Sequence, residues 1–429
     1  MPEACKNADF RWIASDRNYW DGWASKSMFL RKDGQFTRKD INILENEEIC
    51  VLVLLGPIPA VSAIKPTLHY ASSDAIVLTA SSDTGVFMTI PLQQHDQQSN
   101  VYFASAHFAF DGQYILDTSV EYRSYFWENP MMHHYRPNRF SSRNKLNAMK
   151  RFSQEQLPIC TGPSLQGAWM SKVHLQQRDP LRYYDEYATM FGDMTDSSPV
   201  YVPSHCRFNH TMDCLESKTI HVWGDKHTKR NLQLLKDDHV WCNDAETCMC
   251  NETDDPNLTN ADSTIEFGMN TKIQFTYTPM VSSKFNDLKT EMMKSGPEAD
   301  IVILGVGNED FGLTIQNPSH FAIAFKSLLL YTISHYHQSE LIVVRTPQYF
   351  GKDDYGAEKK WNTGLSMAFA NIVRSTVANL SLEQKSRVIL WDTHQLGSNE
   401  NICKSNLLSN QHLVQLENEL LLTLVCNAS

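Results

Sequence analysis

A glycine–aspartate–lysine sequence, Gly224-Asp225-Lys226, lies where a parallel α/β protein presents reactive side chains. The apolar run 219–223 before it predicts a short strand, and the run after it has helical spacing. A strand that leads into a helix through a Gly-Asp turn places the next residue at the carboxyl end of a sheet, where a nucleophile is usually found. A serine there would supply an alcohol, whereas this sequence supplies the amine of Lys226.

The amine limits the chemistry of this position. A lysine amine is protonated near pH 7 unless it is buried or lies beside other cations. An acylated lysine is an amide, which does not turn over as an ester does. If Asp225 and Asp392 lie nearby, they favour the charged form of Lys226. A pocket role and a solvated turn residue are equally compatible with the sequence at Lys226.

Alternating strand and helix patterns after residue 157 predict a doubly wound α/β domain with a parallel sheet. Apolar strands separated by helices are typical of a sheet that is covered on both faces. We expect strands at 219–223, 272–278, 300–306, 340–346 and 387–392, and long helices at 319–337, 360–378 and 407–424.

Residues 236–265 interrupt this pattern with Cys, Asn, Asp and Thr, which predicts an insertion loop. Cys242, Cys248 and Cys250 have a spacing that could hold zinc. The sequons at Asn251 and Asn257 favour disulfides in a glycosylated loop instead. We therefore expect no metal here.

Residues 49–128 contain short β-type runs that predict a small antiparallel sandwich, with an immunoglobulin-like interaction domain as the expected fold. The runs are 49–55, 74–80, 86–90, 101–110 and 114–125, and Asp111-Gly112 predicts a hairpin between the last two. Residues 1–48 are an unassigned N-terminal segment. Residues 129–156 resemble a linker, in which His133-His134 are better explained as polar loop residues than as metal ligands, because no suitably spaced partner accompanies them.

The composition favours the secretory pathway. The chain has 429 residues, which suggests two domains, and a net charge of -11, which argues against binding nucleic acid through its phosphates. Its most apolar run, 49–64, is broken by Gly and Pro and is too short for a membrane span. We expect an extracellular protein, although residue 1 is not followed by a signal peptide. Two sets of residues support this: sequons at Asn209, Asn251, Asn257, Asn379 and Asn427, and disulfide candidates at Cys5, Cys50, Cys160, Cys206, Cys214, Cys242, Cys248, Cys250, Cys403 and Cys426.

Several short stretches match a known family in order. They are Pro158-Ile159-Cys160 with Gly162, Gly167 and Trp169; Val202-Pro203 with Cys206; Cys214-Leu215; Gly224-Asp225 with Lys229; residues 301–305; residues 342–362; Trp391-Asp392; and Leu424-Val425-Cys426. On these residues, residues 157–426 resemble the NXPE family, the neurexophilin and PC-esterase domain-containing proteins of the SGNH/GDSL esterase clan. The preceding β region resembles the family's immunoglobulin-like domain.

The resemblance implies a set of positions for moving or removing O-acetyl groups on sugars. Such chemistry needs a serine nucleophile, a histidine base, an orienting aspartate and oxyanion donors. The serine position is Lys226, and the histidine position in the family's Asn-Ile-His-Pro segment is Cys403. His394, which follows Asp392, and His412 are alternative bases, and Asn308 is the candidate oxyanion donor. Ordinary structural roles remain open for each.

Because two reactive positions are changed, we interpret the chain as a secreted, catalytically inactive relative that binds a protein or a glycan without a cofactor. Loss of the nucleophile alone typically lowers turnover by about 10⁶. The alternative is an active carbohydrate O-acetyltransferase or acetylesterase that uses Thr228 with His394 or His412, with His227 adjacent to Lys226. A third alternative is a component of an extracellular oligomer or filament.

Overall fold

The computed structural model divides the chain into two compact units. The first comprises Met1–Pro158, Gln166–Ser171 and Pro199–Cys206, and the second comprises Ile159–Leu165, Lys172–Ser198 and Arg207–Ser429. The structure describes residues 3–8, 25–31, 33–55, 75–95, 98–122, 141–149, 157–161, 166–188, 196–197, 199–209, 213–236, 263–267, 270–278, 280–282, 284–312, 318–350, 363–397 and 411–428.

The first unit contains two β-sheets in its described part. The five-stranded sheet has the order β2-β1-β4-β8-β7, with every pairing antiparallel. The seven-stranded sheet has the order β12-β11-β6-β5-β9-β10-β3, in which only β10 and β3 run parallel. The strands are β1 (Ser25–Leu30), β2 (Phe36–Thr37), β3 (Ile41–Leu44), β4 (Glu48–Leu55), β5 (Ala75–Ser82), β6 (Phe87–Ile90), β7 (Gln93–His95), β8 (Gln98–His107), β9 (Gly112–Tyr122), β10 (Ser141–Met149), β11 (Gly167–Ser171) and β12 (Pro199–Pro203).

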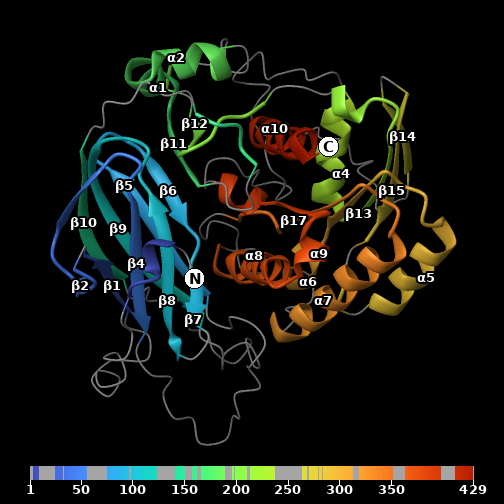
Figure 1. Ribbon diagram of the computed structural model, residues 1–429, viewed down its shortest axis with the longest axis horizontal. Coiled ribbons are helices and arrows are strands. Elements are labelled where there is room, and N and C mark those ends of the chain that lie inside the picture. The colour runs from blue at the N-terminus through green and yellow to red at the C-terminus, as the bar shows by residue number, and fades with distance from the viewer. Residues whose placement is uncertain are drawn as a thin grey trace, which may run out of the picture. The chain divides into compact units, whose positions relative to one another are not determined.

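The two sheets pack face to face. Strand β1 contacts β9 and β10 of the other sheet, and Figure 1 shows the sheets as two layers. At one end of the core, the 3-10 helix η1 (Glu3–Cys5) is joined to β4 by the Cys5–Cys50 disulfide. Buried Leu52, Val101 and Phe103 pack around this disulfide. The structure thus pairs Cys5 with Cys50, two of the disulfide candidates.

The sandwich is larger than its predicted bounds of 49–128. Strands β1 to β3 lie in the segment that was left unassigned, and β10 lies in the stretch interpreted as a linker. Strands β11 and β12, from beyond residue 157, also join the seven-stranded sheet. The sequence pattern did not predict these strands because most of them are short or polar. They form strands because they pair with segments that are distant in the sequence.

The hairpin predicted at Asp111-Gly112 is wrong. Strand β8 pairs with β4 and β7, whereas β9 pairs with β5 and β10, so the chain crosses from one sheet to the other at this point. Phe108 and Phe110 are buried in the crossing segment, and the Tyr114 hydroxyl donates a hydrogen bond to the Phe110 carbonyl oxygen at 2.8 Å. Burial of these rings between two sheets overrides the local turn signal.

The second unit is a six-stranded α/β unit in its described part, with the sheet order β14-β15-β13-β16-β17-β18. All pairs are parallel except β14 with β15, which confirms the predicted parallel sheet. The five predicted strands are β13 (Thr219–Gly224), β15 (Thr271–Tyr277), β16 (Ile301–Gly305), β17 (Leu341–Arg345) and β18 (Val388–Trp391). The edge strand β14 (Ser263–Phe267) begins within the expected insertion loop, and residues 237–262 of that loop lie outside the described residues.

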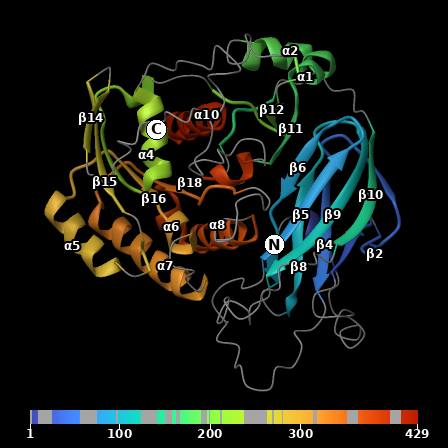
Figure 2. The same cartoon turned by 180° about the vertical axis from the view of Figure 1, so that it is seen from behind.

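Helices cover both faces of this sheet. In Figures 1 and 2, α4 (Lys226–Lys236) and α10 (Gln411–Ala428) lie on one side, and α5 (Phe285–Ser295), α7 (Pro318–His335) and α8 (Thr363–Ala378) lie on the other. The three predicted long helices correspond to α7, α8 and α10. Shorter helical elements complete the described part: α1 (Lys172–Arg178), α2 (Pro180–Arg182), η4 (Tyr183–Tyr187), η5 (Asp213–Leu215), α6 (Asn308–Gly312), α9 (Leu382–Lys385) and η6 (Thr393–Leu396).

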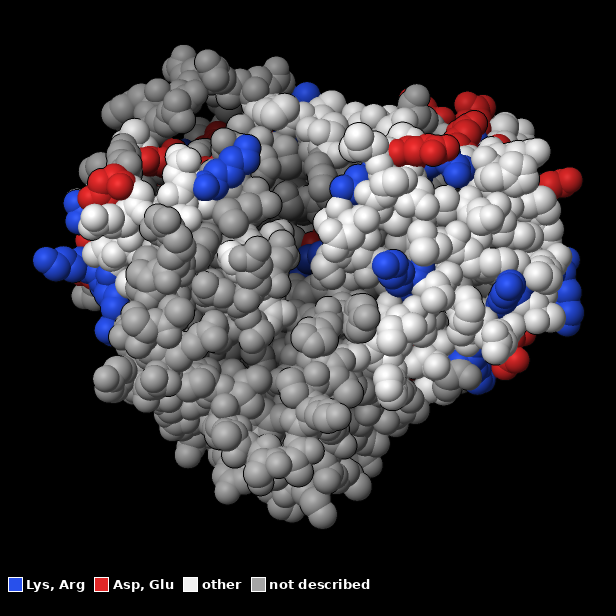
Figure 3. Space-filling model, turned by 60° about the horizontal axis from the view of Figure 1, so that its bottom comes forward, with Lys and Arg blue, Asp and Glu red and all other residues white. Residues whose placement is uncertain are grey.

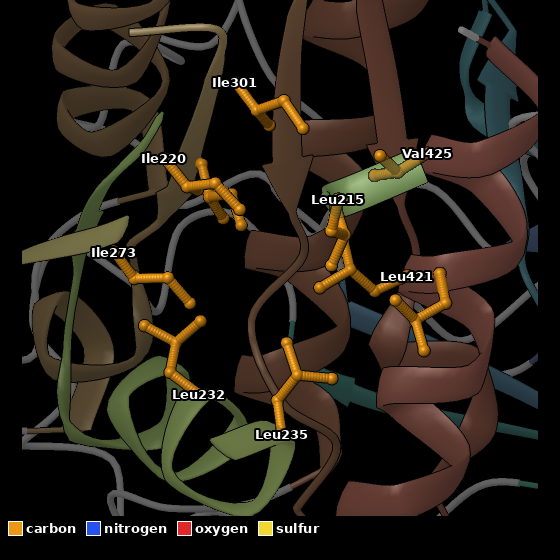
Figure 4. Close-up of a pocket in the computed structure, with 10 residues that line it drawn as sticks. Leu215, Ile220, Leu232, Leu235, Ile273, Ile301, Leu421 and Val425 are labelled. Carbon is orange, nitrogen blue, oxygen red and sulfur yellow. The ribbon is translucent and has the colours of Figure 1, made fainter. Parts of the chain in front are cut away.

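Part of the core between the sheet and the helices α4 and α10 is lined by aliphatic side chains. Figure 4 shows Leu232 and Leu235 of α4 facing Ile220, Ile273 and Ile301 of the sheet across a cavity of about 10 Å³. Because its lining is entirely aliphatic, this cavity is a gap in packing and not a ligand site. The Cys214–Cys426 disulfide ties η5 to the end of α10 on the same side.

Among the described residues, no helix combines the length and apolarity that crossing a bilayer requires.

Candidate functional site

The chain order of the strands makes the carboxyl end of β13 the natural place for a site. From β13 the chain proceeds to β15 on one side and then to β16 on the other. Ligands of open α/β sheets bind where the strand order reverses in this way, beyond the carboxyl ends of the strands. Lys226 lies there as the first residue of α4, and its side chain is half-buried.

Asp225 organises the turn in front of Lys226. One carboxylate oxygen, Oδ1, accepts hydrogen bonds from the backbone N–H groups of His227 and Thr228, each at 3.1 Å. These are donors that a helix start leaves unsatisfied, so Asp225 acts as a cap for α4. Its side chain is fully buried, and burial raises its pKa, a shift that the positive charge of Arg345 opposes.

Thr228, the hydroxyl that the sequence offered as a substitute nucleophile, is committed to the fold. Its hydroxyl can donate either to Asp225 Oδ1, at 3.3 Å, or to the Gly305 carbonyl oxygen, at 3.0 Å. The residue is fully buried. A Cβ on Gly305 would meet Thr228 Oγ1 at 2.1 Å, so the threonine side chain fills the space that this glycine leaves open. The Thr228 side chain is therefore packed between the ends of β13 and β16, and its hydroxyl is not exposed beside Lys226.

Asn308 lies at the start of α6, directly after β16, and is also committed. Its amide Nδ2 donates to Asp225 Oδ2 at 2.7 Å, and its Oδ1 accepts from the backbone N–H of Gln348 at 2.8 Å. The residue is fully buried. Asn308 thus links the ends of β13, β16 and β17, and its amide donor points at a carboxylate.

Asp392 follows β18 and is held by a guanidinium group. Arg374 of α8 donates from Nε to Oδ2 at 2.7 Å and from Nη2 to Oδ1 at 2.8 Å. Gln395 Nε2 and Thr346 Oγ1 donate to the same carboxylate at 2.6 Å and 3.2 Å. Such a two-pronged arginine contact is among the strongest side-chain interactions. The carboxylate therefore pairs with a cation on α8.

His394 contacts a hydroxyl that sequence reasoning missed. Its Nε2 lies 3.2 Å from the Oγ of Ser366 on α8, and both residues are buried. Nδ1 of His394 has no hydrogen-bond partner in the described part of the chain. Burial, and then the charge of Arg374, holds the pKa of His394 well below its ordinary value. Within the described residues, the His394 side chain contacts Ser366 and makes no hydrogen bond to Asp392.

The remaining candidate positions fall into two groups. His412 is buried near the start of α10, where burial lowers its pKa to about 4. Cys403, His133, His134, Cys242, Cys248 and Cys250 lie outside the described residues. In the part of the chain that the structure describes, no group of three His, Cys, Asp or Glu residues could hold a metal ion.

Two acidic residues next to Asn308 were not expected from the sequence. Glu309 accepts hydrogen bonds from the Tyr277 hydroxyl at 2.8 Å and 3.0 Å, one on each carboxylate oxygen. Asp310 accepts from the backbone N–H groups of Val281 and Ser282 at 3.0 Å and 2.8 Å. The Asn-Glu-Asp sequence directly after a buried strand was the available signal, because carboxyl ends of parallel strands share one edge.

Buried charges extend beneath the edge. Arg345, the last residue of β17, donates from Nη2 to Glu417 Oε2 of α10 at 3.1 Å, with each side chain 1% exposed. Asn231 of α4 donates to the same oxygen at 2.8 Å, and the Trp391 indole donates to the Glu417 carbonyl oxygen at 2.8 Å. This network joins α4, α10 and the sheet behind the candidate site.

Comparisons with known proteins give fold-level likeness only. No protein-family model matches the chain, and no curated protein matches it. A GDSL-like lipase from Parabacteroides merdae is 13% identical with a TM-score of 0.33, covering 50% of this chain and 97% of that one. An acetylxylan esterase from Geobacillus stearothermophilus is 12% identical with a TM-score of 0.30, covering 50% and 96%. A carbohydrate esterase family 3 protein from Talaromyces cellulolyticus is 13% identical with a TM-score of 0.33, covering 49% and 100%. Likenesses at this level establish no activity for this chain.

Proposed function

We propose that this protein is a secreted, esterase-related binding protein that has lost acyl-transfer chemistry and recognises an acidic glycan through Lys226. The observation that carries the proposal is the ammonium-bearing side chain at the first position of α4, at the switch point of a parallel sheet. An esterase needs an alcohol or thiol at such a position. Thr228, the nearest hydroxyl, is bonded to Asp225 and to the Gly305 carbonyl oxygen.

The surroundings of the candidate base His394 also support a loss of acyl-transfer chemistry. A base in acyl transfer needs a carboxylate to fix its tautomer and to stabilise the imidazolium. Asp392 is paired with Arg374, and His394 contacts Ser366 instead. A buried histidine whose pKa is held low is a weak base for this task. The altered positions therefore follow two different strands, β13 and β18.

The charge pattern supports a small acidic ligand over a polyanion. On the α/β unit, at the right of Figure 3, Lys and Arg side chains lie singly among uncoloured residues or beside acidic ones. Nucleic-acid binding needs a continuous basic surface, and the net charge of the chain is -11. One cation at a switch point suits the single carboxylate of a sialic or uronic acid residue.

The proposal also includes three finer statements. The protein belongs to the NXPE family, its first unit is immunoglobulin-like, and it is glycosylated and extracellular. The Cys5–Cys50 and Cys214–Cys426 disulfides support an oxidising compartment. The sequon residues Asn379 and Asn427 are exposed, and Asn209 is half-buried, while Asn251 and Asn257 lie outside the described residues. Assembly into an oligomer or filament stays a prediction from the sequence.

Two assays on the purified protein test the proposal. The first measures release of 4-nitrophenol from 4-nitrophenyl acetate, and we expect the rate of a protein blank. The second measures binding of sialyllactose and of a galacturonate trisaccharide, with lactose as the neutral control. Lys226→Ala should abolish binding, whereas Lys326→Ala, which removes an exposed charge on α7, should leave it intact. Binding unchanged by Lys226→Ala would refute the pocket role of this lysine.

A second candidate function, an active acetylesterase or O-acetyltransferase, is favoured by one observation, the 3.2 Å contact between Ser366 Oγ and His394 Nε2. A serine beside a histidine is the arrangement that activates a nucleophile. Against it stands the full burial of Ser366 on the inner face of α8. Turnover of the acetate ester that Ser366→Ala abolishes would establish this alternative.

A further inference from the structure

We propose that Asn379 carries an N-linked glycan, at the edge of the parallel sheet opposite the Lys226 site. Asn379-Leu380-Ser381 is a sequon, and it is the one whose three residues all lie in the described part of the chain. The inference rests on the proposed function, because glycans are attached to this pattern in secreted proteins. It deepens that function by naming one attachment position and its place relative to the ligand site.

Asn379 lies at the corner where the chain leaves α8 and turns into α9. Its backbone N–H still belongs to the helix end, where it donates to the carbonyl oxygens of Ser375 and Thr376 at 3.0 Å and 3.3 Å. Its side chain is exposed and makes no hydrogen bond among the residues that the structure describes. Within this part of the chain, the amide nitrogen that would carry a sugar is thus not committed to the fold.

The rest of the sequon holds the corner in place without covering it. Leu380 is 8% exposed and anchors the turn in the core. The Ser381 hydroxyl accepts from the Gln384 backbone N–H at 3.3 Å, and the Gln384 side chain accepts from the Ser381 backbone N–H at 3.1 Å. Leu382, at the start of α9, is 89% exposed. Exposed residues on both sides of one buried leucine leave room for a sugar on Asn379.

The other two sequon asparagines in the described part are bonded to α10. The backbone N–H of Asn209 donates to the Thr423 hydroxyl at 2.9 Å, and this asparagine is half-buried. The side-chain amide of Asn427 donates to the Thr423 carbonyl oxygen. Of these three asparagines, Asn379 is therefore the one that combines an exposed side chain with an amide that the fold does not use.

The topology places Asn379 at the edge of the sheet that does not carry the candidate site. Helix α8 leads from the carboxyl end of β17 back to the start of the parallel strand β18, so its last turn and α9 lie at the amino ends of the strands. Arg387, between α9 and β18, donates to the carbonyl oxygens of Tyr336 and His337, which precede β17. Lys226 follows the carboxyl end of β13. A glycan on Asn379 would therefore extend from the edge opposite the ligand site.

The transfer of the glycan must precede the folding of α9. The donor is an oligosaccharide on a lipid diphosphate. The bond from its first carbon to the diphosphate breaks, a bond from that carbon to Nδ2 of Asn379 forms, and the lipid diphosphate leaves with the electron pair while the amide gives up one proton. The sequon hydroxyl of Ser381 is needed for this step, whereas in the folded protein it accepts from Gln384. We therefore expect the glycan to be added during synthesis of the chain.

Peptide mapping of the protein isolated from its natural source tests the inference. The peptide that contains Asn379 should carry the mass of an oligosaccharide that begins with N-acetylglucosamine, and peptide N-glycosidase should remove it. Recovery of this peptide with an unmodified asparagine, and without the glycosylated form, would overturn the inference.

Variants of the full chain, produced through the secretory pathway of cultured eukaryotic cells, test the position. Asn379→Gln and Ser381→Ala should each lose the mass of one glycan, whereas Ser381→Thr, which keeps a hydroxyl, should retain it. Asn286→Gln, which replaces an exposed asparagine of α5 outside any sequon, should keep the wild-type mass. An Asn379→Gln protein with the full wild-type glycan mass would contradict the assignment.

Binding of sialyllactose separates this inference from the proposed function. Asn379→Gln should bind with the wild-type affinity, because the glycan lies at the opposite edge from Lys226. An unmodified Asn379 together with binding that depends on Lys226 would overturn the glycan and leave the binding function standing. A glycan on Asn379 without any binding of acidic sugars would do the reverse. Loss of binding in a folded Asn379→Gln protein would overturn the placement of the glycan away from the site.

Discussion

Two buried aspartates end strands of the same sheet, and they are stabilised in different ways. Asp225 after β13 is surrounded by neutral donors: two backbone N–H groups, the Thr228 hydroxyl and the Asn308 amide. Asp392 after β18 is paired directly with the guanidinium of Arg374. In the first case the charge stabilises a helix start, and in the second it neutralises a cation. Among the residues that the structure describes, neither carboxylate accepts a hydrogen bond from a histidine side chain.

The contrast is consistent with our proposal that this sheet edge carries out no acyl-transfer chemistry. A catalytic aspartate must face an imidazole and leave space for it, whereas Asp392 faces an arginine and a glutamine side chain. Asp225 caps the start of α4, whose first residue is Lys226. Under the proposed function, the charged side chain of Lys226 at the switch point serves binding.

Removing the arginine of the Asp392 pair should have the largest effect on stability. Arg374→Ala leaves a carboxylate that is 2% exposed with only hydroxyl and amide donors. Breaking a buried pair from one side typically costs about 3 kcal/mol or more. We expect the free energy of unfolding, measured by guanidinium chloride titration, to fall by about 3 kcal/mol. A loss no greater than that of the exposed-charge control Lys385→Ala would show that the pair is not a structural one.

Removing the other aspartate should cost less, because its partners are neutral. Asp225→Ala deletes the cap that accepts from the N–H groups of His227 and Thr228. Loss of a helix cap costs about 1–2 kcal/mol. Ser381→Ala, which removes the capping box of the exposed helix α9, is the matched control and should cost about 1 kcal/mol or less. A loss in Asp225→Ala that exceeds the loss in Arg374→Ala would reverse the comparison.

The effect expected at Glu309 differs from the other two because it depends on pH. Burial raises its pKa to about 7 in the folded protein from an ordinary value of 4.5, so the folded state holds the proton more tightly than the unfolded chain. The Glu309 contribution to stability therefore falls as pH rises from 4.5 to about 7 and is constant above.

Glu309→Gln has no ionisable carboxyl group at this position, so it lacks the loss of stability that ionisation of Glu309 causes. Its melting temperature relative to the wild type should be higher at pH 8 than at pH 5, as measured by differential scanning calorimetry. Glu383→Gln, which replaces an exposed glutamate, should show no such change between the two pH values. An unchanged difference between Glu309→Gln and the wild type would mean that Glu309 titrates in its ordinary range.

The sequence predicted the α/β sheet well because its strands are short, continuous apolar runs. All five residues of β16 and of β17 are buried, which is the pattern of a strand covered on both faces. The same approach failed for the first unit. There, β10 is largely polar in sequence, and Asp111-Gly112 carries a hairpin signal that the pairing of β8 and β9 does not follow.

The site was predicted in part. Lys226 and Asn308 were expected at strand ends and lie there, because carboxyl ends of parallel strands meet at one edge. The pairings Arg374 with Asp392, Ser366 with His394 and Tyr277 with Glu309 could not be read from the chain. Each joins side chains from different elements, and which neighbour a side chain meets depends on how helices α6 and α8 pack against the sheet.

The central claim is that no side chain at this sheet edge acts as an acyl acceptor. The most direct test is to incubate the folded protein with a fluorophosphonate probe, followed by intact-mass measurement and peptide mapping. We predict no adduct, in the wild type and also in Lys226→Ser, because the Asp392 carboxylate that would orient a base is paired with Arg374. A stoichiometric adduct on Thr228 or Ser366 of the wild type would contradict the account.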